Sequence, residues 1–147
     1  MLYNPHIPPI AEFRGRYRFL SNFYPAIVNL DSIPYPTVEH AFQAAKTIDV
    51  QHRERIRKCN KPGDAKRLGR RVPLRSDWEQ VKLYVMLNLL RQKFSQTEFL
   101  KTQLLATGEA QLIEGNTWND FFWGECMGTG ENHLGKLLMR VRQELRR

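Results

Sequence analysis

The sequence predicts a mainly α (α+β) fold, with a single compact multihelical domain over residues 1–147 and a small β element near the N-terminus. Three observations predict it. Residues 134–145 repeat apolar side chains at the spacing of an amphipathic helix. Residues 81–94 hold too many apolar side chains for one stripe, which favours a central buried helix. The length of 147 residues suits one domain with one core.

The first third of the chain favours short strands followed by a helix. Aromatic and β-branched residues predict strands within residues 13–23 and 26–35, and residues 30–33 fit a hairpin turn. Thr37 is a good N-cap residue, so we expect a helix from there to about Thr47.

The remainder of the chain is expected to be helical with one long interruption. Ser76 with Glu79, and Ser95 with Glu98, have the spacing of a capping box. Residues 114–132 predict a long polar and aromatic loop. The expected helices cover residues 50–58, 62–69, 81–94 and 134–145, with one more that Gly108 ends.

The positive charge of the chain is concentrated in one segment. The formal net charge is +8, and residues 51–75 hold ten Lys and Arg against two Asp and Glu. Such a local excess attracts phosphates, on a nucleotide or on a nucleic acid. It is also compatible with a basic surface that is merely solvated.

Composition excludes several classes of protein. No apolar run approaches the length of a membrane span. The first residues lack the pattern of a signal peptide, and two cysteines are too few for a disulfide framework, so we expect a cytoplasmic protein. The four histidines are scattered without a zinc motif, so no metal site is expected.

The predicted helix after Thr37 carries three polar side chains on one face. Glu39, Gln43 and Lys46 are spaced by four and seven residues, which is close to whole helical turns. A carboxylate, an amide and an amine in line can supply a general acid or base, an orienting group and a nucleophile or cation. An ordinary exposed helix face has the same spacing.

Aromatic residues are concentrated in the loop of residues 114–124. It places two tryptophans, Trp118 and Trp123, among Asn116 and Asp120, a composition suited to stacking on a base while polar groups bind its edge. A hydrophobic plug capped by asparagines is the alternative. Residues 128–135 resemble a phosphate-binding loop before a helix, but they match no established phosphate motif.

Several sequence blocks, in order, resemble the NADAR family of YbiA-like N-glycosidases over about residues 12–145. The blocks are Phe19-Leu20-Ser21-Asn22-Phe23-Tyr24, Tyr35-Pro36-Thr37-Val38-Glu39-His40-Ala41-Phe42-Gln43-Ala44-Ala45-Lys46, Ala65-Lys66-Arg67-Leu68-Gly69-Arg70, Trp78-Glu79 with Lys82 and Met86, Leu104-Leu105-Ala106-Thr107-Gly108, Glu114-Gly115-Asn116-Thr117-Trp118, Asp120, Trp123-Gly124, Asn132, Leu134-Gly135 and Leu138-Met139.

The resemblance implies an enzyme that hydrolyses the ribosyl C1′–N bond of nucleotide-like compounds. It implies catalytic roles for Glu39, Lys46 and Asp120. The substrate-binding residues expected from it and from the basic segment are Ser21, Asn22, Phe23, Gln43, Lys66, Arg67, Asn116, Trp118, Trp123, Asn132 and Gly135. The substrates implied are phosphoribosylamino-pyrimidines of riboflavin synthesis, ADP-ribose-type nucleotides, or ADP-ribose attached to guanine in nucleic acid.

Two chemical routes fit these residues, and neither needs a cofactor. Cleavage builds oxocarbenium character on the ribose, which a carboxylate such as Glu39 or Asp120 stabilises while the other activates water. Alternatively, a neutral Lys46 amine attacks C1′ of the opened sugar and forms a Schiff base. A non-catalytic reader of ADP-ribose or NAD-like ligands, and a basic nucleic-acid binding protein, are the alternatives to an enzyme.

Overall fold

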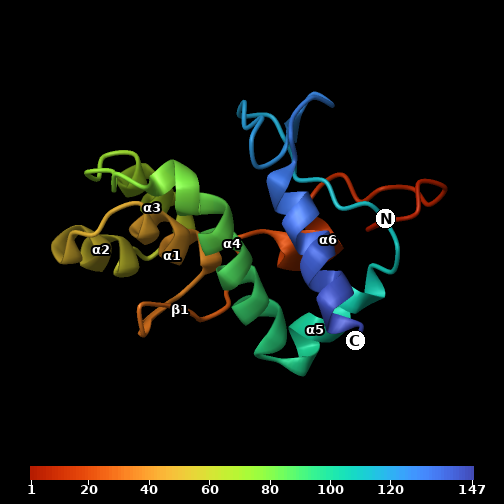
Figure 1. Ribbon diagram of the computed structural model, residues 1–147, viewed down its shortest axis with the longest axis horizontal. Coiled ribbons are helices and arrows are strands. Elements are labelled where there is room, and N and C mark those ends of the chain that lie inside the picture. The colour runs from red at the N-terminus through yellow and green to blue at the C-terminus, as the bar shows by residue number, and fades with distance from the viewer. The chain divides into compact units, whose positions relative to one another are not determined.

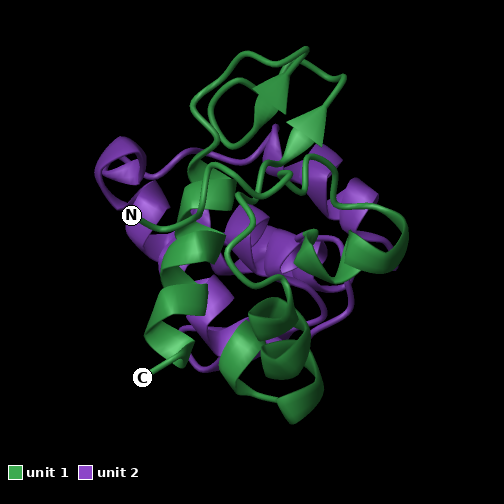
Figure 2. Ribbon diagram, turned by 90° about the vertical axis from the view of Figure 1, so that its right-hand side faces the viewer, with its two compact units in different colours: residues 1–21, 94–147 green, residues 22–93 purple.

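Six α-helices, one 3₁₀ helix and four short strands make up the chain, so the expected mainly α fold with small β elements is confirmed. The computed structural model describes residues 1–147. Figure 2 shows two compact units, of which unit 1 comprises residues 1–21 and 94–147 and unit 2 comprises residues 22–93. No helix combines the length and the apolar character needed to cross a membrane.

Unit 2 begins with a two-stranded antiparallel hairpin, as the sequence predicts. Strand β1 (Val28–Leu30) pairs with β2 (Ile33–Tyr35), with Leu30 opposite Ile33. The two turn residues Asp31 and Ser32 both have positive φ, 50° and 67°. Two such residues are the signature of a tight turn whose twist matches that of the paired strands.

Three short helices follow the hairpin and pack together (Figure 1). Helix α1 (Val38–Ala45) contacts α2 (Val50–Arg57), α3 (Pro62–Gly69) and both strands of the hairpin. Every residue of α1 is buried, which an eight-residue helix can achieve only at the centre of its unit. The predicted bounds of these three helices agree with the structure to within about two residues.

Helix α4 (Trp78–Ser95) is the long helix that the apolar run predicts. Met86, Leu89 and Leu90 are buried, but Tyr84 is 66% exposed, so the helix is not buried on all sides. It begins at Trp78, and the amides of residues 80 and 81 donate to the carbonyl oxygen of Asp77. The expected Ser76 cap is therefore one residue too early.

Unit 1 corrects two local expectations. Residues 15–20 form the 3₁₀ helix η1 (Gly15–Leu20) where a strand was expected, because Gly15 has a φ of +57° and the chain turns there. Helix α5 (Glu98–Ala106) is capped by Thr97, whose side chain accepts the Leu100 amide, and not by Ser95, which ends α4.

The rest of unit 1 is built around the last helix. Strands β3 (Gly115–Asn116) and β4 (Glu125–Cys126) pair in parallel within the long loop, and α6 (His133–Leu145) follows as predicted. The guanidinium of Arg142 in α6 is fully buried and donates to Thr107 Oγ1 and to the carbonyl oxygens of Ala110 and Leu2. It thereby joins α6 to α5, to the segment after α5 and to the start of the chain.

Candidate active site

A buried carboxylate and a buried amide lie side by side on α1. Glu39 and Gln43 are 7% and 5% exposed, and Gln43 Nε2 donates a hydrogen bond of 2.8 Å to Glu39 Oε1. The predicted shared face is thus confirmed for this pair. Because a carboxylate only accepts, the amide group of Gln43 must point its NH₂ at Glu39 and its Oε1 away. That Oε1 is buried without a hydrogen-bond partner.

The start of α1 is fixed by four hydrogen-bond contacts. Thr37 Oγ1 accepts the His40 amide, and the Asn22 carbonyl oxygen accepts the Glu39 amide at 3.1 Å. The His40 ring lies between Thr37 Oγ1 at 2.7 Å and the Cys59 carbonyl oxygen at 2.9 Å. Since that carbonyl can only accept, His40 Nε2 carries its proton. These contacts hold the backbone of Glu39 in one place.

Lys46 follows α1 directly as its C-cap residue. Its carbonyl oxygen accepts the Arg75 amide at 2.7 Å, which fixes the backbone. Burial lowers the pKa of the Lys46 amine, and the cations Arg70 and Lys66 lower it further, while Glu39 opposes them. A lowered pKa increases the fraction of neutral amine, the form that can act as a nucleophile.

Helix α3 supplies the cations that act on Lys46. Lys66 and Arg70 are four residues apart and therefore share one face of the helix. The predicted Arg67 lies one position away, is exposed, and forms an ion pair with Asp64 of the same helix. The sequence predicts Lys66 and Arg67 as substrate-binding residues, and Arg67 and Arg70 as phosphate contacts of the basic segment. Of the two arginines, Arg70 is the one that acts on Lys46.

The predicted residues 21–23 divide between the two units. Asn22 is buried in unit 2, donates from Nδ2 to the Met86 sulfur at 3.6 Å, and has an Oδ1 without a partner. Phe23, also in unit 2, is 42% exposed. Ser21 ends η1 and belongs to unit 1, where its amide donates to the Arg18 carbonyl oxygen.

The long loop of unit 1 is organised by Asn116. Its Nδ2 donates to the Asp120 carbonyl oxygen at 2.9 Å, and its Oδ1 accepts the amides of Asp120 and Trp118. Asp120 Oδ1 in turn accepts the amides of Phe122 and Trp123 at 3.2 and 2.9 Å. Both residues therefore hold the loop in shape. The predicted substrate-binding and catalytic roles of Asn116 and Asp120 stay predictions.

The two tryptophans of the loop have different surroundings. Trp118 is 51% exposed, and its neighbour in the loop, Phe121, is also exposed. Trp123 meets the Phe122 ring edge-on with centroids 4.9 Å apart, and the His133 ring lies 4.4 Å from Phe122. Trp118 thus has the exposure that a stacking role needs, whereas Trp123 belongs to a packed aromatic cluster as a plug would.

The start of α6 is occupied by the loop itself. The carbonyl oxygens of residues 121–124 accept the amides of Glu131, Asn132, His133 and Leu134. A phosphate-binding loop needs such amides free, so the resemblance of residues 128–135 to one is not supported by their geometry.

Asn132 and Gly135 hold this segment against the chain before the long loop. Asn132 Oδ1 accepts the Glu114 amide and its Nδ2 donates to the Leu112 carbonyl oxygen. Gly135 lies so close to that same carbonyl oxygen that a Cβ would clash with it. The predicted substrate contacts of Asn132 and Gly135 stay predictions beside these structural roles.

The structure brings together one subset of the predicted residues. Glu39, Gln43 and Lys46 meet in unit 2, where Lys66 acts on Lys46. In neither unit do three His, Cys, Asp or Glu side chains converge as a metal site requires.

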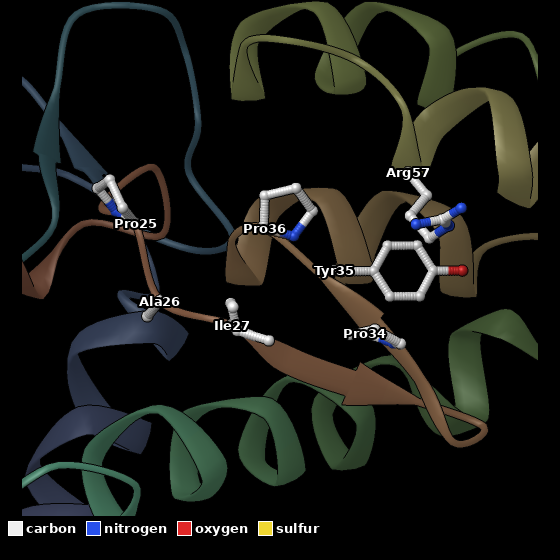
Figure 3. A pocket seen from close by; sticks show the side chains of 7 residues that line it. All are labelled: Pro25, Ala26, Ile27, Pro34, Tyr35, Pro36 and Arg57. Atoms are coloured by element: carbon white, nitrogen blue, oxygen red, sulfur yellow. The ribbon is translucent and has the colours of Figure 1, made fainter.

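An apolar groove of about 440 Å³ lies elsewhere in unit 2 and includes none of the predicted residues. Figure 3 shows Arg57 above the Tyr35 ring on one side of it, with Pro25 and Ala26 on the other. Burial raises the pKa of Tyr35, so its hydroxyl is neutral at physiological pH.

Known proteins are similar to this chain over most of its length. A protein named N-glycosidase YbiA in Shigella flexneri is 46% identical over 132 residues, covering 88% of this chain and 82% of that protein. A riboflavin biosynthesis protein of Vibrio vulnificus is 40% identical over 130 residues, covering 86% of this chain and 35% of that protein.

A solved structure is also similar to this chain. The NMR structure of the Escherichia coli protein YbiA matches with a TM-score of 0.81 and 39% identity, covering 99% of this chain and 93% of that chain. The family model described as the NADAR domain matches residues 11–146. Nearly the whole chain is thus matched in sequence and in fold, and the chain belongs to the NADAR family.

Proposed function

We propose that this chain is an N-glycosidase whose substrate is a phosphorylated ribosyl compound, with Glu39 and Lys46 as its catalytic residues. The observation that carries the proposal is a buried carboxylate that Gln43 orients on one short helix, with an amine of lowered pKa at the C-cap of the same helix. The relatives named N-glycosidase support the reaction type.

Glu39 is suited to the charge that develops on the sugar. As the C1′–N bond breaks, positive charge spreads over C1′ and the ring oxygen, and a fixed carboxylate stabilises it. The hydrogen bond from Gln43 occupies one carboxylate oxygen and contributes to the orientation of the group. A preoriented carboxylate does not have to reorganise as the charge develops, which is where such groups gain most of their effect.

Lys46 supports a covalent route. The neutral Nζ attacks C1′, the C1′–N bond to the base breaks, and the ring opens to leave an imine between Lys46 and the sugar. The two protons lost by Nζ pass to the departing base nitrogen and to the ring oxygen. Water then hydrolyses the imine to the sugar aldehyde and restores the amine. The alternative keeps Lys46 as a cation while water attacks directly.

Phosphate binding is assigned to the cationic face of α3. Lys66 and Arg70 act on Lys46 electrostatically, so a phosphate that neutralises them lies within reach of the same helix face. The names of relatives linked to riboflavin biosynthesis favour a phosphoribosylamino-pyrimidine as the substrate. ADP-ribose-type nucleotides and ADP-ribose on guanine in nucleic acid share the phosphate and the ribosyl bond, and the test separates them.

The test is release of the base from a panel of substrates, followed by mass spectrometry. The panel holds a phosphoribosylamino-pyrimidine, its dephosphorylated form, ADP-ribose, NAD and DNA carrying ADP-ribose on guanine. We expect cleavage of the first compound, a raised KM for its dephosphorylated form, and a loss of that difference in Lys66→Glu. Tight binding without cleavage of any member would identify a reader of nucleotides and overturn the proposal. Binding to DNA with a steep salt dependence and no cleavage would favour a nucleic-acid binding protein.

A further inference from the structure

Gly69 is the residue of α3 that lies directly against the site helix. A Cβ built on it falls 2.7 Å from Gln43 Cδ, 3.0 Å from Gln43 Cβ and nearer still to Gln43 Oε1. Gly69 itself is buried. Its backbone is helical without positive φ, so conformational freedom does not account for glycine here. Glycine is needed because a larger residue would leave no space for the Gln43 side chain.

The contact explains the unpartnered oxygen of Gln43. The hydrogen that Gly69 carries in place of a side chain points at Oε1, which makes a Cα–H···O contact, a weak but recurrent interaction between packed helices. Gln43 is thus held from both ends, by Glu39 at Nε2 and by the Gly69 backbone at Oε1. At 5% exposure, the side chain has no solvent to turn into.

We propose that Gly69 is a positioning residue, which sets the orientation of the Glu39 carboxylate through the Gln43 amide. This role rests on the proposed function of Glu39. Any side chain at position 69 displaces the Gln43 amide from α3 and breaks or bends its hydrogen bond to Glu39. The carboxylate then keeps its charge and its backbone position but loses the orienting hydrogen bond from Gln43.

The position of Gly69 also relates the two halves of the proposed chemistry. Lys66, Gly69 and Arg70 are spaced by three and four residues, so they share one face of α3. The same face therefore carries the cations that act on Lys46 and the glycine that orients the carboxylate partner. The close approach of α3 to α1 brings the cations near Lys46 and Gly69 against Gln43, and the absence of a side chain on Gly69 permits this approach.

The first test is Gly69→Ala, with Gly63→Ala as the matched control. Gly63 lies on the same helix, and a Cβ there meets nothing within 4 Å. We expect Gly69→Ala to lower kcat by about tenfold with KM within about twofold, since misplacing a reacting group affects the chemical step. Gly63→Ala should leave both constants within about twofold. Equal kinetics in the two variants would overturn the proposal.

The second test is a double-mutant cycle with Gln43→Ala. If Gly69 acts through Gln43, the added methyl has room once the amide is gone, and the double variant matches Gln43→Ala within about twofold. Losses that multiply would show that Gly69 acts elsewhere and would overturn the proposal. Should Gly69→Ala fail to fold, folding of the double variant supports the steric conflict with Gln43, and its failure to fold contradicts it.

The third test does not depend on activity. The side-chain NH₂ resonances of Gln43, assigned by comparison with Gln43→Ala, report its hydrogen bond to Glu39. We expect them to move in Gly69→Ala and to stay in place in Gly63→Ala. A protein that cleaves no member of the substrate panel, yet shows this shift, disproves the proposed function and leaves the contact standing. Unmoved resonances in Gly69→Ala disprove the positioning role.

Discussion

Gln43 donates from Nε2 to Oε1 of Glu39 at 2.8 Å, one helical turn apart and with both side chains buried. A carboxylate in such a place is costly unless it is hydrogen-bonded, and unpaired buried charge is rare in proteins. Buried charges of this kind are concentrated at functional sites, where the charge takes part in the chemistry.

Glu39→Gln is expected to remove nearly all turnover and to leave the fold intact. The substitution preserves the shape of the side chain and its ability to accept from Gln43, but it removes the charge. We expect a loss of at least about 100-fold in kcat, the usual contribution of a general acid or base. Initial rates and the far-UV circular dichroism spectrum measure the two effects. Turnover within a few-fold of the parent in a folded variant would exclude the catalytic role.

Asp120→Asn separates the chemical role of Asp120 from its structural one. The Oδ1 of asparagine can accept the same amides of Phe122 and Trp123, so the loop should keep its shape. Loss of the charge alone is expected to lower kcat by about 100-fold if Asp120 is the second carboxylate of the reaction. Asp120→Ala, which removes the acceptor too, should in addition lower the thermal midpoint. Full activity in Asp120→Asn would leave Asp120 with the structural role only.

Borohydride added during turnover is expected to trap the sugar on Lys46. Reduction of the imine leaves a stable adduct, and mass spectrometry should find it on the peptide that contains Lys46. Lys46→Arg should abolish both the adduct and the covalent route, because a guanidinium stays protonated at any working pH. A parent enzyme that cleaves substrate and yields no adduct would favour direct attack by water. The N-glycosidase assignment would survive that result.

Arg70→Gln is expected to move the pH profile of kcat/KM, which reports the free enzyme, to higher pH, with Arg67→Gln as its control. Arg70 disfavours the protonated form of Lys46, so its removal raises the pKa of the Lys46 amine. If the neutral amine is the nucleophile, the rate should then reach half its maximum at a higher pH. Arg67 pairs with Asp64 and is not among the groups that act on Lys46, so its variant should keep the parent profile. Superimposable profiles for all three proteins would argue against an amine nucleophile.

Lys93 is expected to make stability rise with pH above neutrality. The amine is fully buried, and burial lowers its pKa to about 7, whereas the unfolded chain titrates near its usual 10.5. Between these values the unfolded state binds the extra proton, so the free energy of unfolding increases with pH. Below pH 7 both states are protonated and the folded state bears the full cost of the buried charge. Nζ lies 5.6 Å from the centre of the Tyr24 ring, which recovers part of that cost.

Lys93→Met is the variant that tests this dependence. It should raise the thermal midpoint at pH 6 and flatten the increase between about pH 7 and 10. Thermal unfolding across that range measures both, with a surface variant such as Lys101→Met as the control. An unchanged slope would show that Lys93 is not the group responsible.

Local chemistry determined which elements could be predicted. The Thr37 cap, the two-residue turn at Asp31 and Ser32, and the helices α2 and α3 all depend on residues adjacent in the chain, and all were predicted. The pairing of Glu39 with Gln43 also follows from helical spacing. These signals are local, so a single sequence carries them.

The remainder depends on contacts between distant segments. The close approach of Gly69 to Gln43 joins residues 26 positions apart, and no local sequence pattern around either residue predicts it. The sequence alone also does not show that the Asp120 carboxylate accepts the backbone amides of Phe122 and Trp123. The strand expected around residues 13–23 was wrong for a local reason. Aromatic and β-branched residues favour a strand, but Gly15, with its positive φ, turns the chain into a 3₁₀ helix.

The contacts of the two units form at different times during synthesis, as the buried Arg142 of unit 1 illustrates. Unit 2 is one continuous stretch, residues 22–93, and all of its contacts can form as soon as that stretch has left the ribosome. Unit 1 consists of both ends of the chain, and its buried guanidinium reaches back 140 residues to the Leu2 carbonyl oxygen. Contacts of such separation form late, because a long loop must close first. The N-terminal segment therefore stays unfolded, with its aromatic residues exposed to solvent, until the last helix has been synthesised. A nascent chain arrested before α6 would hold a folded unit 2 and an unfinished unit 1, and proteases would cut it within residues 1–21 first.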